Sequence, residues 1–176
     1  MKEFVTGEMR VATRYQSHLA PLLACCAQAF SRTKAPVLEI GMGHFSTPQL
    51  RAVCANSGIQ LVSVELNDQW RELFLAKYPE TSWHQIANGF QCITGDNTFS
   101  VVLIDDSPGG ANRARHFKNF IDVAQFVVVH DYHYDNEGHI SPILSERPEI
   151  KSRVFSDYEP PTLVASLAIE PAYLTI

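Results

Sequence analysis

Short apolar runs alternate with segments of helical periodicity along the chain, and few folds accommodate such an alternation. The clearest runs, 101–104 and 126–129, contain no polar residue, so both faces of each expected strand must be covered. Such strands, separated by helices, predict a parallel sheet between two layers of helices. The expected strands are 36–40, 59–64, 83–86, 101–104, 126–129, 153–156 and 162–169, and the expected helices are 13–31, 46–58, 67–78, 113–124 and a short one starting at Ser141-Pro142.

The chain is long enough for one full domain, and no sequence feature divides it. At 176 residues it can bury about 70% of the surface that its unfolded form exposes. No internal repeat, low-complexity stretch or Gly/Ser/Pro-rich linker is present in the sequence. We therefore expect a single domain over residues 1–176, with a helical extension at 1–35 and an α/β core at 36–176.

Charge and hydropathy restrict the partners of the chain. With 14 basic and 19 acidic residues the formal net charge is −5, and the sequence has no run of Lys or Arg, so nucleic acid is not expected as the main partner. A hydrophobic fraction of 45% is too high for a disordered chain. The sequence has neither the apolar run of a signal peptide at its start nor the ~20 apolar residues of a membrane span. We expect a cytoplasmic protein without a membrane partner.

The four cysteines do not form a metal or redox motif. Cys25 and Cys26 are adjacent, whereas Cys54 and Cys92 lie far along the chain, so the C-x-x-C spacing of zinc and redox sites is absent from the sequence. We expect buried, reduced thiols, in agreement with a cytosolic protein.

Residues capable of chemistry gather where the expected strands end. They are the segment 41–46, Glu65, Asp105-Asp106 and His130-Asp131. In open parallel sheets, ligands bind beyond the carboxyl ends of the strands, next to the point where the strand order reverses. The grouping therefore predicts a ligand site at the carboxyl ends of the sheet.

A glycine turn follows the first strand of the expected core. Gly41 and Gly43 tolerate a positive φ, and their missing Cβ atoms let a ligand approach the backbone. Glu65 ends the next strand, where a carboxylate can accept hydrogen bonds from both hydroxyls of a ribose. A packing turn and a solvated glutamate are the alternative interpretation. Ser46 stands at the third position of the glycine fingerprint of NAD sites, and Glu39 suits a cationic ligand better than a pyrophosphate, so the pattern disfavours NAD.

Three motifs, in order along the chain, resemble those of the class I S-adenosylmethionine-dependent methyltransferases. They are VLEIGMG at 37–43, SVE at 63–65 and VLIDD at 102–106. The resemblance covers about residues 36–166 and implies a Rossmann-like, doubly wound sheet with an antiparallel strand near the C-terminus. It also implies that the glycine turn abuts the methionine part of the cofactor, that Glu65 binds the ribose and that Leu66 packs on the adenine. The expected cofactor-binding residues are Glu39, Gly41, Met42, Gly43, Ser46, Glu65, Leu66, Asn88, Asp105 and Asp106.

Aspartates and histidines form a second group of candidates. Some cation-dependent O-methyltransferases of the superfamily that this sequence resembles hold Mg²⁺ with aspartates at similar strand ends. This resemblance makes Asp105 and Asp131 candidate metal ligands. Without a metal, His130, His133 or Asp131 could act as the general base. The expected catalytic residues are therefore Asp105, His130, Asp131 and His133. A buried core histidine and a capping aspartate are the structural alternative at 130–131.

Other polar residues received weaker interpretations. His116 and His139 are expected at the surface. Arg113 and Arg115 could pair with an anionic substrate or could simply be solvated at a helix start. Trp70 is assigned no role, because it could be a core or a rim aromatic residue.

The sequence thus predicts a methyltransferase that acts on an oxygen or nitrogen nucleophile of a small molecule. The chain has almost no insertion that could form a lid, so the N-terminal helix, the loop 132–141 or a second subunit of a homodimer would complete the pocket. Two alternatives remain, a metal-dependent hydrolase that uses the Asp/His group and a cofactor-binding module without catalysis.

Overall fold

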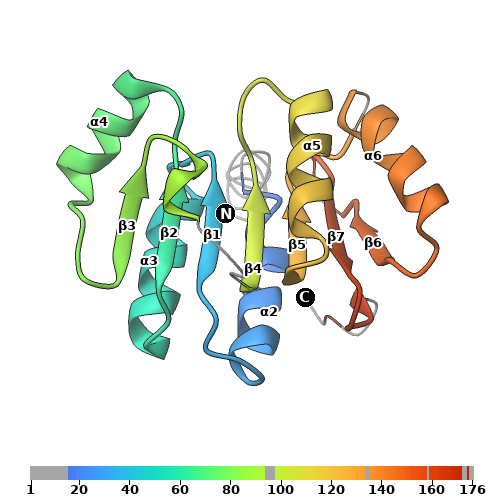
Figure 1. Cartoon of the computed structure of the whole chain (residues 1–176), viewed down its shortest axis with the longest axis horizontal. Helices are drawn as coiled ribbons and strands as arrows, with labels where there is room; N and C mark the ends of the chain where they lie inside the picture. Colours follow the sequence, from blue (N-terminus) through green and yellow to red (C-terminus); the bar gives the residue numbers. More distant parts are fainter. Residues whose placement is uncertain (1–15, 94–97, 134, 158, 172–173, 175–176) are drawn as a thin grey trace, which may run out of the picture.

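The computed structural model describes residues 16–93, 98–133, 135–157, 159–171 and 174, without the Cys92 side chain. At its centre is one sheet of seven strands, in the order β3-β2-β1-β4-β5-β7-β6 (Figure 1). The strands are β1 (Val37–Ile40), β2 (Leu61–Val64), β3 (His84–Ala87), β4 (Phe99–Ile104), β5 (Ala124–Val129), β6 (Lys151–Phe155) and β7 (Thr162–Ser166). The helices are α2 (Leu19–Phe30), α3 (Ser46–Ser57), α4 (Asp68–Lys77), α5 (Ala111–Phe120) and α6 (Asp135–Glu146), with a 3₁₀ turn, η1, at Phe90–Cys92.

The strand directions create a crevice at the middle of the sheet. Strands β3, β2, β1, β4 and β5 are mutually parallel, and β7 is antiparallel to both β5 and β6. From β1 the chain proceeds outward to β2 and β3, and it then returns to β4 on the other side of β1, so the order reverses between β1 and β4. These findings confirm the mostly parallel, Rossmann-like sheet with an antiparallel C-terminal strand, and they put the expected ligand crevice above β1 and β4.

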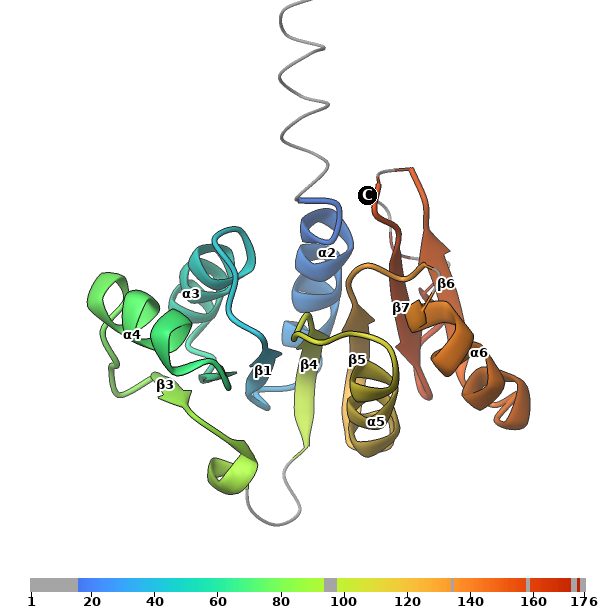
Figure 2. The ribbon, with the colours of Figure 1, turned by 90° about the horizontal axis from the view of Figure 1, so that it is seen from above.

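Helices cover both faces of the sheet, as the wholly apolar strands require. Helices α2 and α3 lie on one face, and α5 and α6 lie on the other (Figure 2). In β1, Leu38 and Ile40 belong to the core on the side of α5, whereas Val37 belongs to the core on the side of α2. Helix α2 is part of this second core, because its Leu22 and Cys25 are fully buried there.

Helices α6 and α5 show clear differences from the predicted boundaries. Helix α6 begins at Asp135 and contains Pro142, although Ser141-Pro142 predicted a start there. The Ser141 hydroxyl does not cap a helix but lies 3.0 Å from the Tyr132 hydroxyl, and the acidic first turn of α6 suits its helix dipole. Helix α5 ends at Phe120, and Ala124, expected in this helix, starts β5. Helix α2 begins at Leu19, later than expected: residues 16–18 form a turn, and residues 13–15 of the expected helix lie outside the described part of the chain.

The described cysteines Cys25, Cys26 and Cys54 are buried and free, as predicted. Within the described ranges, no helix combines the length and the apolarity needed to cross a bilayer.

Candidate functional site

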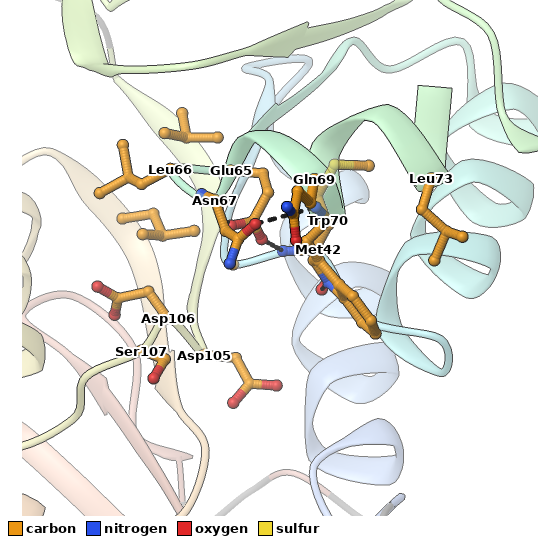
Figure 3. A pocket seen from close by; sticks show the side chains of 13 residues that line it. Met42, Glu65, Leu66, Asn67, Gln69, Trp70, Leu73, Asp105, Asp106 and Ser107 are labelled. Atoms are coloured by element: carbon orange, nitrogen blue, oxygen red, sulfur yellow. Dashed lines mark hydrogen bonds between the residues drawn. The ribbon is translucent and has the colours of Figure 1, made fainter. Parts of the chain in front are cut away.

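A cavity of about 600 Å³ opens at the carboxyl ends of β1, β2 and β4. Residues of β2 and α4 form one side of it, and residues 105–107, which follow β4, form another (Figure 3). The side chains of Leu66 and Leu73 are about half exposed at its rim. The lining residues are Ile40, Gly41, Met42, Val64, Glu65, Leu66, Asn67, Gln69, Trp70, Leu73, Asp105, Asp106 and Ser107.

Gly41 forms the floor of this cavity, where β1 turns against the end of β4. Its φ is 87°, a conformation that side chains other than glycine rarely adopt. A Cβ atom at this position would lie 2.5 Å from the carbonyl oxygen of Asp105, far inside van der Waals contact. Only glycine therefore permits this turn to lie so close to β4.

Glu65 presents a fixed carboxylate to the cavity. Its Oε2 accepts a hydrogen bond from the Met42 backbone N–H at 3.0 Å, and its Oε1 accepts one from the Asn67 N–H at 2.8 Å. Each oxygen retains a second lone pair, so both can still accept a hydroxyl. The side chain of Trp70 strengthens the same corner, because its Nε1–H donates to the Met42 carbonyl oxygen at 2.7 Å.

Glu39 lies beneath the glycine turn and lines neither of the cavities described here. It is fully buried, and its carboxylate accepts hydrogen bonds from the hydroxyls of Ser46 (2.7 Å), Thr47 (2.9 Å) and Ser63 (2.6 Å). Burial raises the pKa of Glu39 to about 7, although these hydrogen bonds oppose the shift. The expected contact between Glu39 and a ligand therefore does not agree with the structure, since the residue faces hydroxyls inside the core.

A second cavity, of about 200 Å³, lies on the other side of the glycine turn. Asp105 lines both cavities, and Gly41 and Gly43, two positions apart on the same turn, line the first and the second respectively. The two cavities are therefore neighbours at the end of β4. The second is lined by His18, Gly43, His44, Phe45, Ser46, Asp105, His130 and Asp131.

Asp105 and His130 form a hydrogen-bonded pair at this second cavity. His130 Nδ1 lies 2.9 Å from Asp105 Oδ1, and His130 Nε2 lies 3.2 Å from the Ser17 hydroxyl and 3.6 Å from Asp131 Oδ1. Burial alone would raise the pKa of Asp105, but the hydrogen bond and charge of His130, together with the charge of Arg113, lower it below its ordinary value. The ionised Asp105 favours the tautomer in which Nδ1 carries the proton and Nε2 offers a lone pair.

Arg113 neutralises part of this acidic cluster from inside the protein. Its guanidinium donates to Asp105 Oδ1 (3.2 Å) and to the backbone carbonyls of Asp106 (2.9 Å) and His130 (2.5 Å). It also lies 3.6 Å from Asp131 Oδ2. Arg113 is 6% exposed, so it is not solvated and is not open to an anionic substrate. Both interpretations predicted from the sequence for Arg113 are therefore wrong. Because a cation already contacts both aspartates, Asp105 and Asp131 do not fit the expected Mg²⁺ site.

His18, which precedes α2, is buried against this pair. Its ring centroid lies 4.2 Å from that of His130, and neither of its nitrogens has a hydrogen-bond partner among the residues that the structure describes. Burial, followed by the charge of His130, lowers the pKa of His18 to about 4. One ligand atom each from His18, Asp105 and His130 lies within 4.8 Å of the others, a spacing that could hold a metal ion.

The structure brings most, but not all, of the expected site residues together. Asn88 follows β3 and is exposed, and it does not line the larger cavity. His133 lines neither cavity, and its Nδ1 lies 3.1 Å from the backbone oxygen of Asp131. His116 is buried, not at the surface as predicted, because it lies on the inner face of α5 against Phe90.

The lining residues that the sequence did not predict include Asn67, Trp70 and His18. Trp70 and Asn67 follow Glu65 closely, so their position at the start of the next helix was a usable signal. His18 lies far along the chain from its neighbour His130, and no local pattern links the two.

Solved structures resemble this chain in fold. They include an O-methyltransferase from Bacillus cereus in complex with SAH (TM-score 0.59, 12% identity, covering 90% of this chain and 86% of the other). They also include the N-methyltransferase NodS from Bradyrhizobium japonicum (TM-score 0.58, 15% identity, covering 88% of this chain and 94% of the other). A third is an rRNA methylase from Streptococcus thermophilus (TM-score 0.54, 8% identity, covering 86% of this chain and 93% of the other). Comparisons of the sequence with protein-family models and with curated proteins find no match. The chain therefore has the class I methyltransferase fold, as the sequence motifs predicted.

Proposed function

We propose that this chain is an S-adenosylmethionine-dependent methyltransferase that acts on an oxygen or nitrogen nucleophile of a small molecule. The observation that carries the proposal is Glu65, whose carboxylate two backbone N–H groups hold at the cavity beside Gly41. A carboxylate fixed in this way suits the two hydroxyls of a ribose. The fold agrees with this activity but does not by itself establish it.

We assign the whole cofactor to the larger cavity. Its volume of about 600 Å³ is within the usual range of small-molecule sites. We assign the glycine turn to the methionine part, Glu65 to the ribose, and the apolar surfaces of Leu66 and Trp70 to the adenine. When bound, S-adenosylmethionine supplies a methyl group on a positively charged sulfur.

The smaller cavity suits the methyl acceptor, because Asp105 lines both cavities. We assign proton removal to His130, whose Nε2 offers a lone pair next to this cavity. After it takes a proton, the imidazolium would have Asp105 beside Nδ1 and Asp131 beside Nε2, and both carboxylates would stabilise it. A volume of about 200 Å³ and the acidic walls favour a small molecule over a nucleic acid.

One observation favours a second candidate function. The His18, Asp105 and His130 cluster has the ligand types of a transition-metal site, which suits a metal-dependent hydrolase. This alternative gives no role to Glu65 or to the larger cavity, so we prefer methyl transfer.

Calorimetric titration with S-adenosylmethionine, its demethylated product SAH and NAD tests the proposal. We expect selective binding of the first two, with an affinity at least about 10-fold lower in Glu65→Ala, because hydrogen bonds to a charged group contribute roughly 1.5–3 kcal/mol each. Glu72→Ala, at an exposed position on α4, is the matched control. Absence of binding, or equal binding by both variants, would contradict the proposal.

A further inference from the structure

His18 is the least explained polar residue of the described chain. It is 2% exposed and lines the smaller cavity, and no described residue offers a hydrogen bond to either ring nitrogen. Burying an unsatisfied polar group destabilises the folded state, and native proteins rarely keep such groups without a function. The free nitrogens therefore point to a ligand that supplies the missing partner.

The charges around the smaller cavity indicate the kind of ligand. Asp105 and Asp131 are acidic, Arg113 is the cation that contacts both, and the burial of His18 disfavours a charge on its ring. While His130 is neutral, Asp105, Asp131 and Arg113 together therefore carry one net negative charge. Among the described residues that line this cavity, none is a lysine or an arginine.

We propose that the smaller cavity binds a small primary amine in its ammonium form, with His18 and Asp131 as the recognising residues. This inference rests on the proposed methyl transfer and names its acceptor. An ammonium group carries three N–H donors, which suit the lone pair of a neutral His18 and the carboxylate of Asp131. A carboxylate substrate would be repelled by two aspartates, and a hydroxyl would leave the negative charge uncompensated.

The backbone at Asp131 supports this assignment independently. Its φ is 53°, in the left-handed region that residues other than glycine seldom adopt. Asp enters this region more readily than most residues, and non-glycine residues found there cluster at active sites and ligand sites. The Asp131 side chain is 34% exposed, so it remains accessible to a ligand.

Transfer to an amine needs one proton acceptor, and His130 supplies it. The ammonium gives a proton to the lone pair of His130 Nε2. Before the amine binds, the Ser17 hydroxyl, 3.2 Å from Nε2, can donate a hydrogen bond to this lone pair. The amine nitrogen then forms its new bond to the methyl carbon as the carbon–sulfur bond breaks. The electron pair of the broken bond stays on sulfur, which becomes a neutral thioether. The product is the N-methylammonium ion, and the imidazolium returns its proton to solvent.

The experiment compares three ligands with the same carbon chain: butylammonium, 1-butanol and butyrate. Each is titrated into the full chain saturated with SAH, and the side-chain nitrogens of ¹⁵N-histidine are followed by NMR. We expect butylammonium to shift the His18 signals at a concentration at least about 10-fold lower than the other two. Transfer of a labelled methyl group should show the same order of preference.

Two variants separate recognition from folding. His18→Phe keeps the ring shape and removes the unsatisfied nitrogens, so we expect unchanged or higher stability together with loss of the preference for the amine. Asp131→Asn keeps a residue that tolerates positive φ and should lower the same preference about 10-fold. His139→Phe, at an exposed position on α6, should change nothing.

Three results would overturn the inference. They are equal binding of the amine and the alcohol, an unfolded His18→Phe variant, and shifts of His18 and His130 on addition of Zn²⁺ but not of butylammonium. The last result would assign the cluster to a metal. In each case SAH binding, measured first, shows whether the larger cavity and the proposed function still stand.

Discussion

The two cavities beside the glycine turn differ in how their polar groups are held. In the larger cavity, both oxygens of Glu65 accept backbone N–H groups, and the indole N–H of Trp70 is bound to the Met42 carbonyl. In the smaller cavity, His18 has no hydrogen-bond partner among the described residues, and the backbone of Asp131 has a positive φ.

This difference corresponds to two kinds of ligand. Polar groups that are fixed before binding lose little entropy when a ligand arrives, which suits one ligand that is the same in every reaction cycle. Groups that await a partner are costly in the free protein and are satisfied only by a particular ligand. This contrast agrees with the proposed division into a cofactor site in the larger cavity and an acceptor site in the smaller one.

Substitution of the shared turn should disrupt both cavities and gives the largest expected effect. In Gly41→Ala the new Cβ would lie 2.5 Å from the Asp105 carbonyl oxygen, at a φ of 87°. We expect a loss of several kcal/mol of unfolding free energy, measured by urea denaturation, and loss of SAH binding. Gly58→Ala is the matched control: its φ is also positive, at 64°, but no atom lies within 4 Å of the new Cβ. It should cost about 1 kcal/mol, and equal losses in the two variants would contradict the close-approach argument.

Glu39 supports the turn from below and should make stability depend on pH. Its pKa is raised from 4.5 in the unfolded chain to about 7, so its stabilising effect is complete below about pH 4.5 and is lost as the pH rises through 7. The loss corresponds to roughly 3 kcal/mol. In urea denaturation at about pH 5 and about pH 8, Glu39→Gln should remove this part of the decline.

His18 and His84, whose pKa values burial lowers to about 4, change stability in the opposite direction over part of this range. The difference between Glu39→Gln and wild type, and not the wild-type curve alone, therefore isolates Glu39. Glu72→Gln should give the wild-type pH dependence, and a Glu39→Gln profile parallel to wild type would refute the assignment.

His130 and His133 test whether the base belongs to the smaller cavity. His130→Gln should lower methyl transfer by roughly 100-fold or more, because it removes the proposed general base, and it should leave SAH affinity unchanged. His133→Gln should change the rate less than about 2-fold, since His133 lines neither cavity. The measurement is labelled methyl transfer to an acceptor that the wild-type protein turns over. The reverse order of effects would move the base to His133.

The sequence predicted the features that depend on neighbouring residues. Apolar runs identified the strands, and Gly41 identified the sharp turn, because both signals are local. Burial of a polar side chain depends instead on distant segments. Glu39 faces Ser63 of the adjacent strand, and Arg113 reaches the carbonyl of His130, so neither partner was visible in the chain around them.

The smallest expected effect concerns Trp70, at the corner of the larger cavity. A substitution here can separate the hydrogen bond of its indole N–H from the packing of its ring. Trp70→Phe keeps a ring near His44 and Phe74 but removes the 2.7 Å hydrogen bond to the Met42 carbonyl. Loss of one such bond costs about 1 kcal/mol, so SAH affinity, measured by calorimetry, should fall about 5-fold. Butylammonium binding should not change, because Trp70 does not line the smaller cavity. Trp83→Phe is the control, and an equal loss there would show that the hydrogen bond to Met42 does not order the cofactor site.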